Sequence, residues 1–296
     1  MAKDREVFRI EHLAPDRLDH LVDAQNGIFA DYIVPMKLTK PFFLDFLRSV
    51  GGDLANVLVA LDGERIVGYV NPVIDGQEAW IGGVGVLPSY RRRGLGRDLM
   101  LAGENFARKR GAQEVTLEVI EGNYGAQKLY ESMGYSPTRK YLTAEGRPIR
   151  FEGFGDLPSS ATLSELQKLH EASYKDTCWQ RRKLQSLVQA ARGAECYKLD
   201  GGFVLVRTVE TNGFIPFLGV VPEMRGKGVG TSLAKFALTR LYDLGAFKVA
   251  LYNINDDLPT LRMLDIFDFK VTMKQLEMKV LLHHRVVTST SPQQCH

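Results

Sequence analysis

The chain contains two copies of one pattern, spaced 134 residues apart without a gap. The stretch "VGVLPSYRRRGLG" ends at Gly96, and "LGVVPEMRGKGVG" ends at Gly230. The same spacing continues through further matching positions, which include Leu99 with Leu233, Leu117 with Leu251, and Tyr135 with Phe269. A correspondence that stays in register over this length indicates two copies of one structural unit, because chance convergence would affect only a short loop.

Length and composition agree with two domains. The 296 residues are 45% hydrophobic and 25% charged, which is enough for each half to bury its own core. The stretch "GFGDLPSSATLS", near 153–164, is rich in Pro, Gly and Ser and interrupts the hydrophobic pattern. We therefore predict an N-terminal domain at 1–152, a C-terminal domain at 153–285 and a polar tail at 286–296.

Charge and cysteine content exclude several classes of protein. The net charge of +3 gives no field that would attract nucleic acid or anionic membranes. The first ten residues lack the apolar core of a signal peptide, and no apolar run is long enough to span a bilayer. Cys178, Cys196 and Cys295 form no C-x-x-C spacing. We expect a cytoplasmic protein with reduced thiols and no metal, and the oligomeric state stays open between monomer and homodimer.

Each copy has the pattern of an α+β unit. The first begins with apolar runs around the Asp62-Gly63 hairpin signal and continues with a run at 78–88, which together predict three antiparallel strands. Apolar residues at helical spacing predict a helix over 94–110. A strand at 114–120, a helix at 123–134 and a last strand from 135 follow. The central feature is therefore a strand, a glycine-rich turn and a helix.

The glycine-rich turn has the chemistry of a phosphate site. Glycines at 94 and 96 let backbone N–H groups point into one concavity, and the helix that follows adds the positive end of its dipole. The spacing fits neither a Walker loop nor a dinucleotide fingerprint. A tight corner with solvated arginines explains one copy of the pattern equally well, so the residues alone leave both interpretations open.

The combination of motifs resembles the GNAT superfamily of acyl-CoA-dependent N-acyltransferases. Its signature is [QR]-x-x-G-x-[GA] after a strand that ends V-x-P, followed by N-x-x-A-x-x-L-Y-x-x-x-G-[FY]. The second motif is complete in "LEVIEGNYGAQKLYESMGY", residues 117–135. The resemblance extends over nearly the whole chain. It implies two tandem GNAT-like domains, each a mixed, mostly antiparallel sheet flanked by helices, with acetyl-CoA as co-substrate.

The resemblance also implies site residues. The family tyrosine, here Tyr130, is proposed to protonate the departing CoA thiolate, although a tyrosine in this position would otherwise be taken for a core residue. The expected cofactor-binding residues are Val84, Gly85, Val86, Arg91, Arg92, Arg93, Gly94, Leu95, Gly96 and Asn123 in the first half, and Val220, Arg225, Gly226, Lys227, Gly228, Val229 and Gly230 in the second.

The two halves differ where the chemistry would occur. The residue that corresponds to Asn123 is Asp257, and the one that corresponds to Tyr130 is Leu264. Leucine has no proton to donate. The resemblance therefore implies that the first half is catalytic, whereas the second binds CoA without reacting or only shapes the acceptor cleft.

The reaction also needs a base. An amine of pKa about 10.4 is mostly protonated at neutral pH, which adds roughly 4.6 kcal/mol to the barrier. Glu118 lies five residues before Asn123, a spacing that also occurs in ribosomal-protein alanine acetyltransferases. Strand alternation places it on the face opposite Leu117 and Val119. A solvated carboxylate is the competing interpretation of Glu118, and Glu121 is a second candidate.

The acceptor cannot be named from the sequence. The expected acceptor segment is aromatic-rich and contains Asp31, Tyr32 and Asp45. The carboxylates of the two aspartates would hold a cationic amine or simply face solvent. We expect an N-acetyltransferase that acts on an amine of a small molecule or protein. The alternative is a non-catalytic acyl-CoA-binding sensor or scaffold.

Overall fold

The computed structural model describes residues 8–34, 37–153 and 156–282. The predicted polar tail at 286–296, with Cys295, lies outside this range. In the first half the strands are β1 (Arg9–His12), β2 (Leu58–Asp62), β3 (Arg65–Asp75), β4 (Glu78–Val86), β5 (Glu114–Ile120) and β6 (Ser136–Gly146). The helices are α1 (Leu18–Ile28), α2 (Lys40–Val50), α3 (Leu95–Lys109) and α4 (Tyr124–Ser132).

The second half repeats this order with one more helix, and the strand that corresponds to β4 is divided in two, β10 and β11. Its strands are β7 (Ser159–Ser160), β8 (Glu195–Leu199), β9 (Gly202–Val209), β10 (Asn212–Phe214), β11 (Leu218–Val220), β12 (Lys248–Asn255) and β13 (Lys270–Leu281). Its helices are α5 (Leu163–Ser173), α6 (Trp179–Arg182), α7 (Leu184–Ala191), α8 (Val229–Asp243) and α9 (Leu258–Ile266). The α+β class and the tandem arrangement predicted from the sequence are confirmed.

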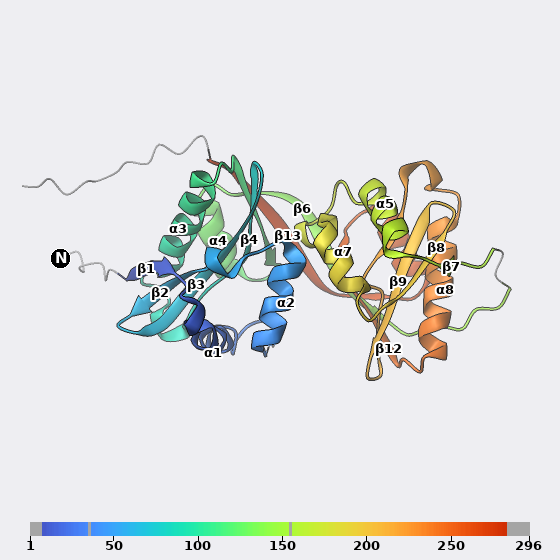
Figure 1. Ribbon diagram of the computed structural model, residues 1–296, viewed down its shortest axis with the longest axis horizontal. Helices are drawn as coiled ribbons and strands as arrows, with labels where there is room; N and C mark the ends of the chain where they lie inside the picture. Colours follow the sequence, from blue (N-terminus) through green and yellow to red (C-terminus); the bar gives the residue numbers. More distant parts are fainter. Residues whose placement is uncertain (1–7, 35–36, 154–155, 283–296) are drawn as a thin grey trace, which may run out of the picture.

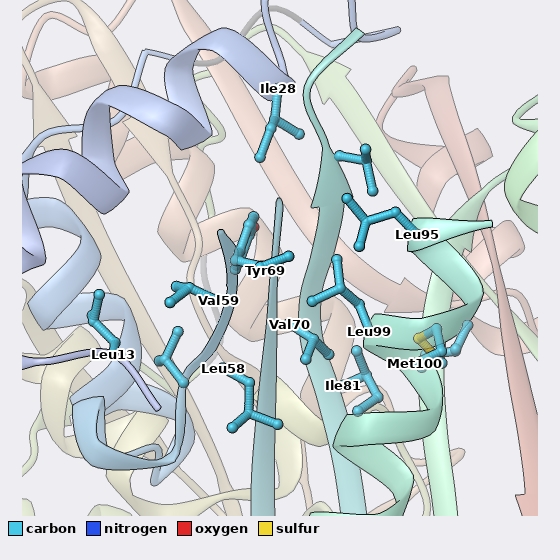
Figure 2. Packing of buried hydrophobic residues seen from close by; sticks show 14 of the residues in the cluster. Leu13, Ile28, Leu58, Val59, Tyr69, Val70, Ile81, Leu95, Leu99 and Met100 are labelled. Carbon is cyan, nitrogen blue, oxygen red and sulfur yellow. The ribbon is translucent and has the colours of Figure 1, made fainter. Parts of the chain in front are cut away.

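The core of the first half lies on both faces of the sheet, one of which packs against α3 (Figure 2). Leu95, Leu99 and Met100 project from α3 toward Val70 of β3 and Ile81 of β4, and all five are buried. The approach is close. A Cβ on residue 68 of β3 would lie 2.8 Å from Cδ1 of Leu99, and a Cβ on residue 202 of β9 would lie 2.7 Å from Cδ1 of Leu233. Both positions are glycine, so the helix packs on bare backbone in each half.

The two halves exchange their last strands. The order in the sheet is β1-β2-β3-β4-β5-β13-β6-β12-β10-β9-β8-β7, and β11 pairs with β9. The second half's β13 therefore lies between β5 and β6 of the first half, and β6 in turn pairs with β12. Figure 1 shows β13, in red, passing from the second half along the edge of the first. The sheet is continuous through both repeats.

The sequence did not indicate this exchange. The domain boundary predicted near residue 152 lies between β6 and β7 in the chain, and it stays a prediction. In space the repeats are not divided at this point, because each repeat obtains a strand from the other. Within the described ranges, no helix is both long and apolar enough to cross a membrane.

Candidate active site

The parallel strands β4 and β5 of the first half separate from each other, and we call the region between their diverging ends the first cleft. Pairing between β4 and β5 ends at Ile81 and Leu117, although β4 continues to Val86 along β3. The register of β4 on β3 shifts between Val70 and Pro72, beside the two glycines that follow Ile81. Beyond this point the backbone groups of β4 at 84–86 have no partner strand on the β5 side. They can therefore pair with the amides of an extended ligand as a strand would.

The glycine-rich turn closes the outer end of this cleft. Gly94 is the N-cap of α3 with φ 86° and ψ −8°, and Arg92 before it also has a positive φ of 64°. The backbone N–H groups of Arg97 and Asp98 donate to the Gly94 carbonyl and are the first to bond within the helix. The N–H groups of the residues before them, at the N-terminus of α3, have no acceptor within the helix. Arg92 and Arg93 are exposed beside them. This is the geometry that the sequence predicts for a pyrophosphate site.

Arg91 has a different position from the other arginines of the turn. Its guanidinium donates to both carboxylate oxygens of Asp31, at 2.7 and 2.8 Å, and to the carbonyls of Val86 and Ile28 at 3.1 and 2.8 Å. Arg91 therefore fastens the end of α1 to the turn, and its side chain supports the predicted site from behind. The same pair lowers the pKa of Asp31 through the hydrogen bonds from Arg91. Both oxygens of the ionised Asp31 carboxylate are thus paired with the Arg91 guanidinium, which argues against a role of Asp31 in holding an amine.

Glu118 lies at the apex of the cleft. It is the first residue of β5 after the last pair with β4, and it points away from the buried Leu117 and Val119. One carboxylate oxygen, Oε2, accepts a hydrogen bond of 2.6 Å from the indole of Trp80, whereas Oε1 is buried without a hydrogen-bond partner among the described residues. Burial raises the pKa of Glu118 to about 8, despite the Trp80 hydrogen bond, and Glu277 adds to the rise.

The predicted alternative base is less suitable. Glu121 is exposed at the end of β5 and forms an ion pair with Lys140 at 3.3 Å. Asp45, in the predicted acceptor segment, pairs with Arg48 one turn later on α2 at 2.8 Å. Both carboxylates have cationic partners on the surface, whereas Oε1 of Glu118 is buried without a partner among the described residues.

Tyr130 is buried on α4 in a cluster of tyrosines. Burial raises its pKa, and the nearby Tyr32 and Tyr69 raise it further, so the hydroxyl stays protonated at neutral pH. Asn123 caps α4 by accepting the Ala126 amide at 3.2 Å, and its side chain lies near the Tyr32 hydroxyl, whose pKa is raised by burial. The capping role gives Asn123 a structural reason to be present, in addition to the cofactor contact that the sequence predicts.

Helix α6 of the second half forms a packed wall against β4 and α2 of the first half. Trp179 of α6 stacks on Trp80 with ring centroids 6.0 Å apart and an interplanar angle of 7°, and its indole donates to the Val50 carbonyl at the end of α2. Arg182 of α6 pairs with Glu78 at the start of β4. This wall was not predicted from the sequence, because nothing local in "CWQRRK" indicates which surface it covers.

The second half keeps the turn of the first. Its N-cap, Gly228, has φ 87° and ψ −10°, nearly the values of Gly94. Arg225 repeats the two carbonyl contacts of Arg91, since it donates to the Val220 carbonyl at 3.1 Å and to the Ser173 carbonyl at 3.0 Å. The predicted pyrophosphate contacts of this loop stay a prediction.

The cleft behind this second turn is occupied by the protein's own side chains. The Tyr174 hydroxyl donates to the carbonyl of Leu218, the residue that corresponds to Val84, at 2.6 Å. Arg181 donates to that hydroxyl and, at 3.1 Å from its Nε, to the Tyr252 carbonyl on the opposite strand. The first half has Phe29 at the end of α1 where the second has Tyr174 at the end of α5, and phenylalanine cannot make this bond. The second cleft is therefore bridged internally.

The second half keeps the cap of the last helix but has no tyrosine at the position of Tyr130. Asp257 caps α9 by accepting the Thr260 amide at 2.9 Å, as Asn123 does in α4. Leu264 is buried where the first half has Tyr130. The helix is kept as a structural element, and the hydroxyl is lost.

These features define a tandem acetyltransferase fold whose two repeats differ, because side chains bridge the second repeat where β4 and β5 diverge in the first. The model of the Acetyltransferase (GNAT) family matches residues 23–135 and 162–269, and the chain belongs to this family. Among solved structures, a GCN5-related N-acetyltransferase from Sphaerobacter thermophilus aligns with a TM-score of 0.71 at 17% identity, over 95% of this chain and 97% of that one. A tandem GNAT protein from the clavulanic acid biosynthesis pathway aligns with a TM-score of 0.68 at 16% identity, over 95% and 100%.

Curated relatives resemble parts of the chain. The mycothiol acetyltransferase of Corynebacterium glutamicum is 35% identical over 31% of this chain, and the match spans 32% of that protein. The putative [ribosomal protein bS18]-alanine N-acetyltransferase of Bacillus subtilis is 30% identical over 46% of this chain and 88% of its own length. The aminoglycoside N(6')-acetyltransferase type 1 of Salmonella typhimurium is 24% identical over 42% and 76%. All three relatives are acetyltransferases, but their names give different acceptors, so these matches do not indicate the acceptor of this chain.

Proposed function

We propose that the chain transfers an acetyl group from acetyl-CoA to a primary amine of a small molecule or a protein, in the cleft of the first half. The observation that carries the proposal is Glu118, whose Oε1 is buried without a partner at the apex of the cleft, among the residues described. A carboxylate whose pKa is raised to about 8 is a much stronger base than an ordinary glutamate, and it accepts a proton from an ammonium more readily.

The remaining groups have matching roles. The amine nitrogen attacks the thioester carbonyl, Glu118 takes the proton from that nitrogen, the C–S bond breaks, and Tyr130 donates its proton to the departing thiolate. The backbone of β4 at 84–86 pairs with the pantetheine arm, and the turn at 91–96 binds the pyrophosphate. The stacked Trp80 and Trp179 are both buried, so the second half contributes to the packing around Glu118.

We further propose that the first cleft alone takes up acyl-CoA. The bridge formed by Tyr174 and Arg181 already uses the Leu218 carbonyl and the facing Tyr252 carbonyl, which a pantetheine arm would need to approach. The second half then acts as a structural partner that supplies β13 and α6. The alternative function, a non-catalytic acyl-CoA sensor, also agrees with an internally bridged second cleft. Release of CoA thiol in the presence of amines distinguishes it from the enzyme.

The test is release of CoA thiol across a panel of amines by wild type and Glu118→Gln. Wild type should release thiol with an acid limb in kcat/KM near pH 8. The variant should lose that limb, and its deficit should shrink as the pH approaches the pKa of the acceptor amine, because a neutral amine needs no base. The rate of thiol release with an aromatic amine of low pKa should be nearly the same in wild type and Glu118→Gln. Binding of acetyl-CoA without thiol release from any amine would favour the sensor, and an equal loss at all pH values would remove Glu118 as base.

A further inference from the structure

The exchanged strand brings a second carboxylate to the base. In the antiparallel pair of β5 and β13, Glu277 lies directly opposite Glu118. Residues directly opposite in such a pair point to the same face of the sheet, with Cβ atoms about 5 Å apart. Glu277 is only 5% exposed. A residue of the second half is therefore buried beside the proposed base of the first.

Glu277 is held by donors from β6. Its Oε1 accepts a hydrogen bond of 2.6 Å from the Thr138 hydroxyl and lies 3.1 Å from Nε of Arg139. Its Oε2 accepts a hydrogen bond of 2.9 Å from the Tyr141 hydroxyl. Three donors thus address both oxygens, which fixes the carboxylate in place and stabilises its negative charge. Strand exchange creates this arrangement, because β13 lies between β5 and β6.

The second cleft has no such pair. The repeat spacing relates Glu118 to Tyr252 and Glu277 to Thr143, so neither carboxylate has a counterpart. The pair therefore occurs only in the cleft that also contains Tyr130. Because the structure shared by both halves does not require Glu277, its presence is better explained by a role in the chemistry of the first half.

We propose that Glu277 is a positioning residue for the reaction, whose fixed negative charge beside Glu118 strengthens Glu118 as a base. The inference rests on the proposed function, in which Glu118 accepts the proton of the amine. Two like charges at this distance resist being ionised together, so a proton on Glu118 is favoured while Glu277 stays charged. The second half thereby contributes to catalysis without binding acyl-CoA itself.

The other groups around Glu118 act differently from Glu277. Trp80 on β4 donates a hydrogen bond to it, and Arg182 on α6 is a nearby cation, so both favour the ionised carboxylate. Cys178, at the start of α6, is a buried thiol whose pKa is raised to about 12, chiefly by burial and also by Glu118. Tyr141 and Arg139 on β6 reach Glu277. Glu277 is the charged neighbour that opposes ionisation of Glu118.

The experiment is the pH profile of kcat/KM for the acceptor in the full chain, with acetyl-CoA saturating. Glu277→Gln should move the acid limb to lower pH by about one unit or more, because the opposing charge is gone. Glu277→Asp should keep the limb close to the wild-type position, since it keeps the charge while disturbing the same contacts. A limb that stays in place in Glu277→Gln, or that moves equally in both variants, would overturn the inference.

Two further variants isolate the effect of the Glu277 charge. Glu114→Gln removes another carboxylate from the same face of β5, one that pairs with Lys279 of β13 at 2.8 Å, and it should leave the limb in place. Arg139→Gln removes the cation beside Glu277 from a partly exposed site, so it should fold even if Glu277→Gln does not, and it should move the limb to higher pH. An unmoved limb in Arg139→Gln also counts against the inference. If Glu118→Gln itself retains the limb, the proposed base is wrong, whereas loss of the limb there with no shift in Glu277→Gln rejects only the role of Glu277.

Discussion

The indole Nε1 of Trp80 donates a hydrogen bond of 2.6 Å to Oε2 of Glu118, across the point where β4 and β5 separate. The bond leaves the other oxygen, Oε1, as the acceptor that faces no protein donor in the described chain. One oxygen is thus used to orient the carboxylate, and the other is available for a proton. The same indole stacks on Trp179, so the orientation of the base depends on both halves of the molecule.

Trp80→Phe should weaken the enzyme mainly at low pH. The substitution keeps an aromatic ring for the stack and removes the donor to Glu118. The pKa of Glu118 should then rise, and the acid limb of kcat/KM should move up by about one pH unit, because a hydrogen bond to a charged group contributes about 1.5 kcal/mol or more.

Trp179→Phe is the matched control for this change. It removes an indole donor from the same stacked pair, but that indole donates to the Val50 carbonyl and not to Glu118. Stopped assays over the pH range should show the limb shifted in the Trp80 variant only. Equal shifts in both variants would mean that the stack, rather than the hydrogen bond, controls the base.

Tyr130→Phe should lower kcat by about 10²-fold, the usual effect of losing a general acid, with acetyl-CoA affinity nearly unchanged. Burial raises the pKa of Tyr130, so its hydroxyl carries the proton that the thiolate requires. Tyr135→Phe, at a buried ring 5.9 Å away, serves as the comparison, and kcat there should stay within a few-fold of wild type. A similar kcat for the two variants would exclude Tyr130 as the acid.

Acetyl-CoA should bind with a stoichiometry of one per chain. Gly94→Glu should abolish binding in calorimetry, since the side chain enters the pyrophosphate turn with a negative charge, whereas Gly228→Glu should leave it close to wild type. The two glycines have φ of 86° and 87°, so both substitutions impose the same backbone strain of about 1–2 kcal/mol. Two equivalents in wild type, or loss of binding in Gly228→Glu, would show that the bridged second cleft opens.

The repeated local structures were predictable from the sequence, whereas the contacts between repeats were not. The turns around Gly94 and Gly228 were predictable because left-handed backbone and a helix start depend on neighbouring residues. The exchange of β6 and β13 was not, because two strands of similar alternating pattern compete for the edge of β5, and long-range packing decides the pairing. Glu277 became visible only through that pairing. The assignment of Arg91 to the cofactor stays a prediction, and the sequence did not indicate that its guanidinium also binds Asp31 and the Ile28 carbonyl.

The raised pKa of Glu118 should also appear in the stability of the fold. The folded pKa of about 8 lies above the ordinary value of 4.5, so below pH 4.5 the group is protonated in both states and ionisation costs nothing. As the pH rises from about 4.5 to 8, the unfolded chain releases this proton more easily, and the free energy of unfolding falls. Glu118→Gln has no proton to release. Its stability should match that of wild type below about pH 4 and exceed it above pH 8 by up to about 5 kcal/mol in urea unfolding. Glu121→Gln, at an exposed carboxylate nearby, should change the stability little at either pH, and a Glu118→Gln curve parallel to wild type would contradict the buried, proton-accepting state on which the proposed chemistry depends.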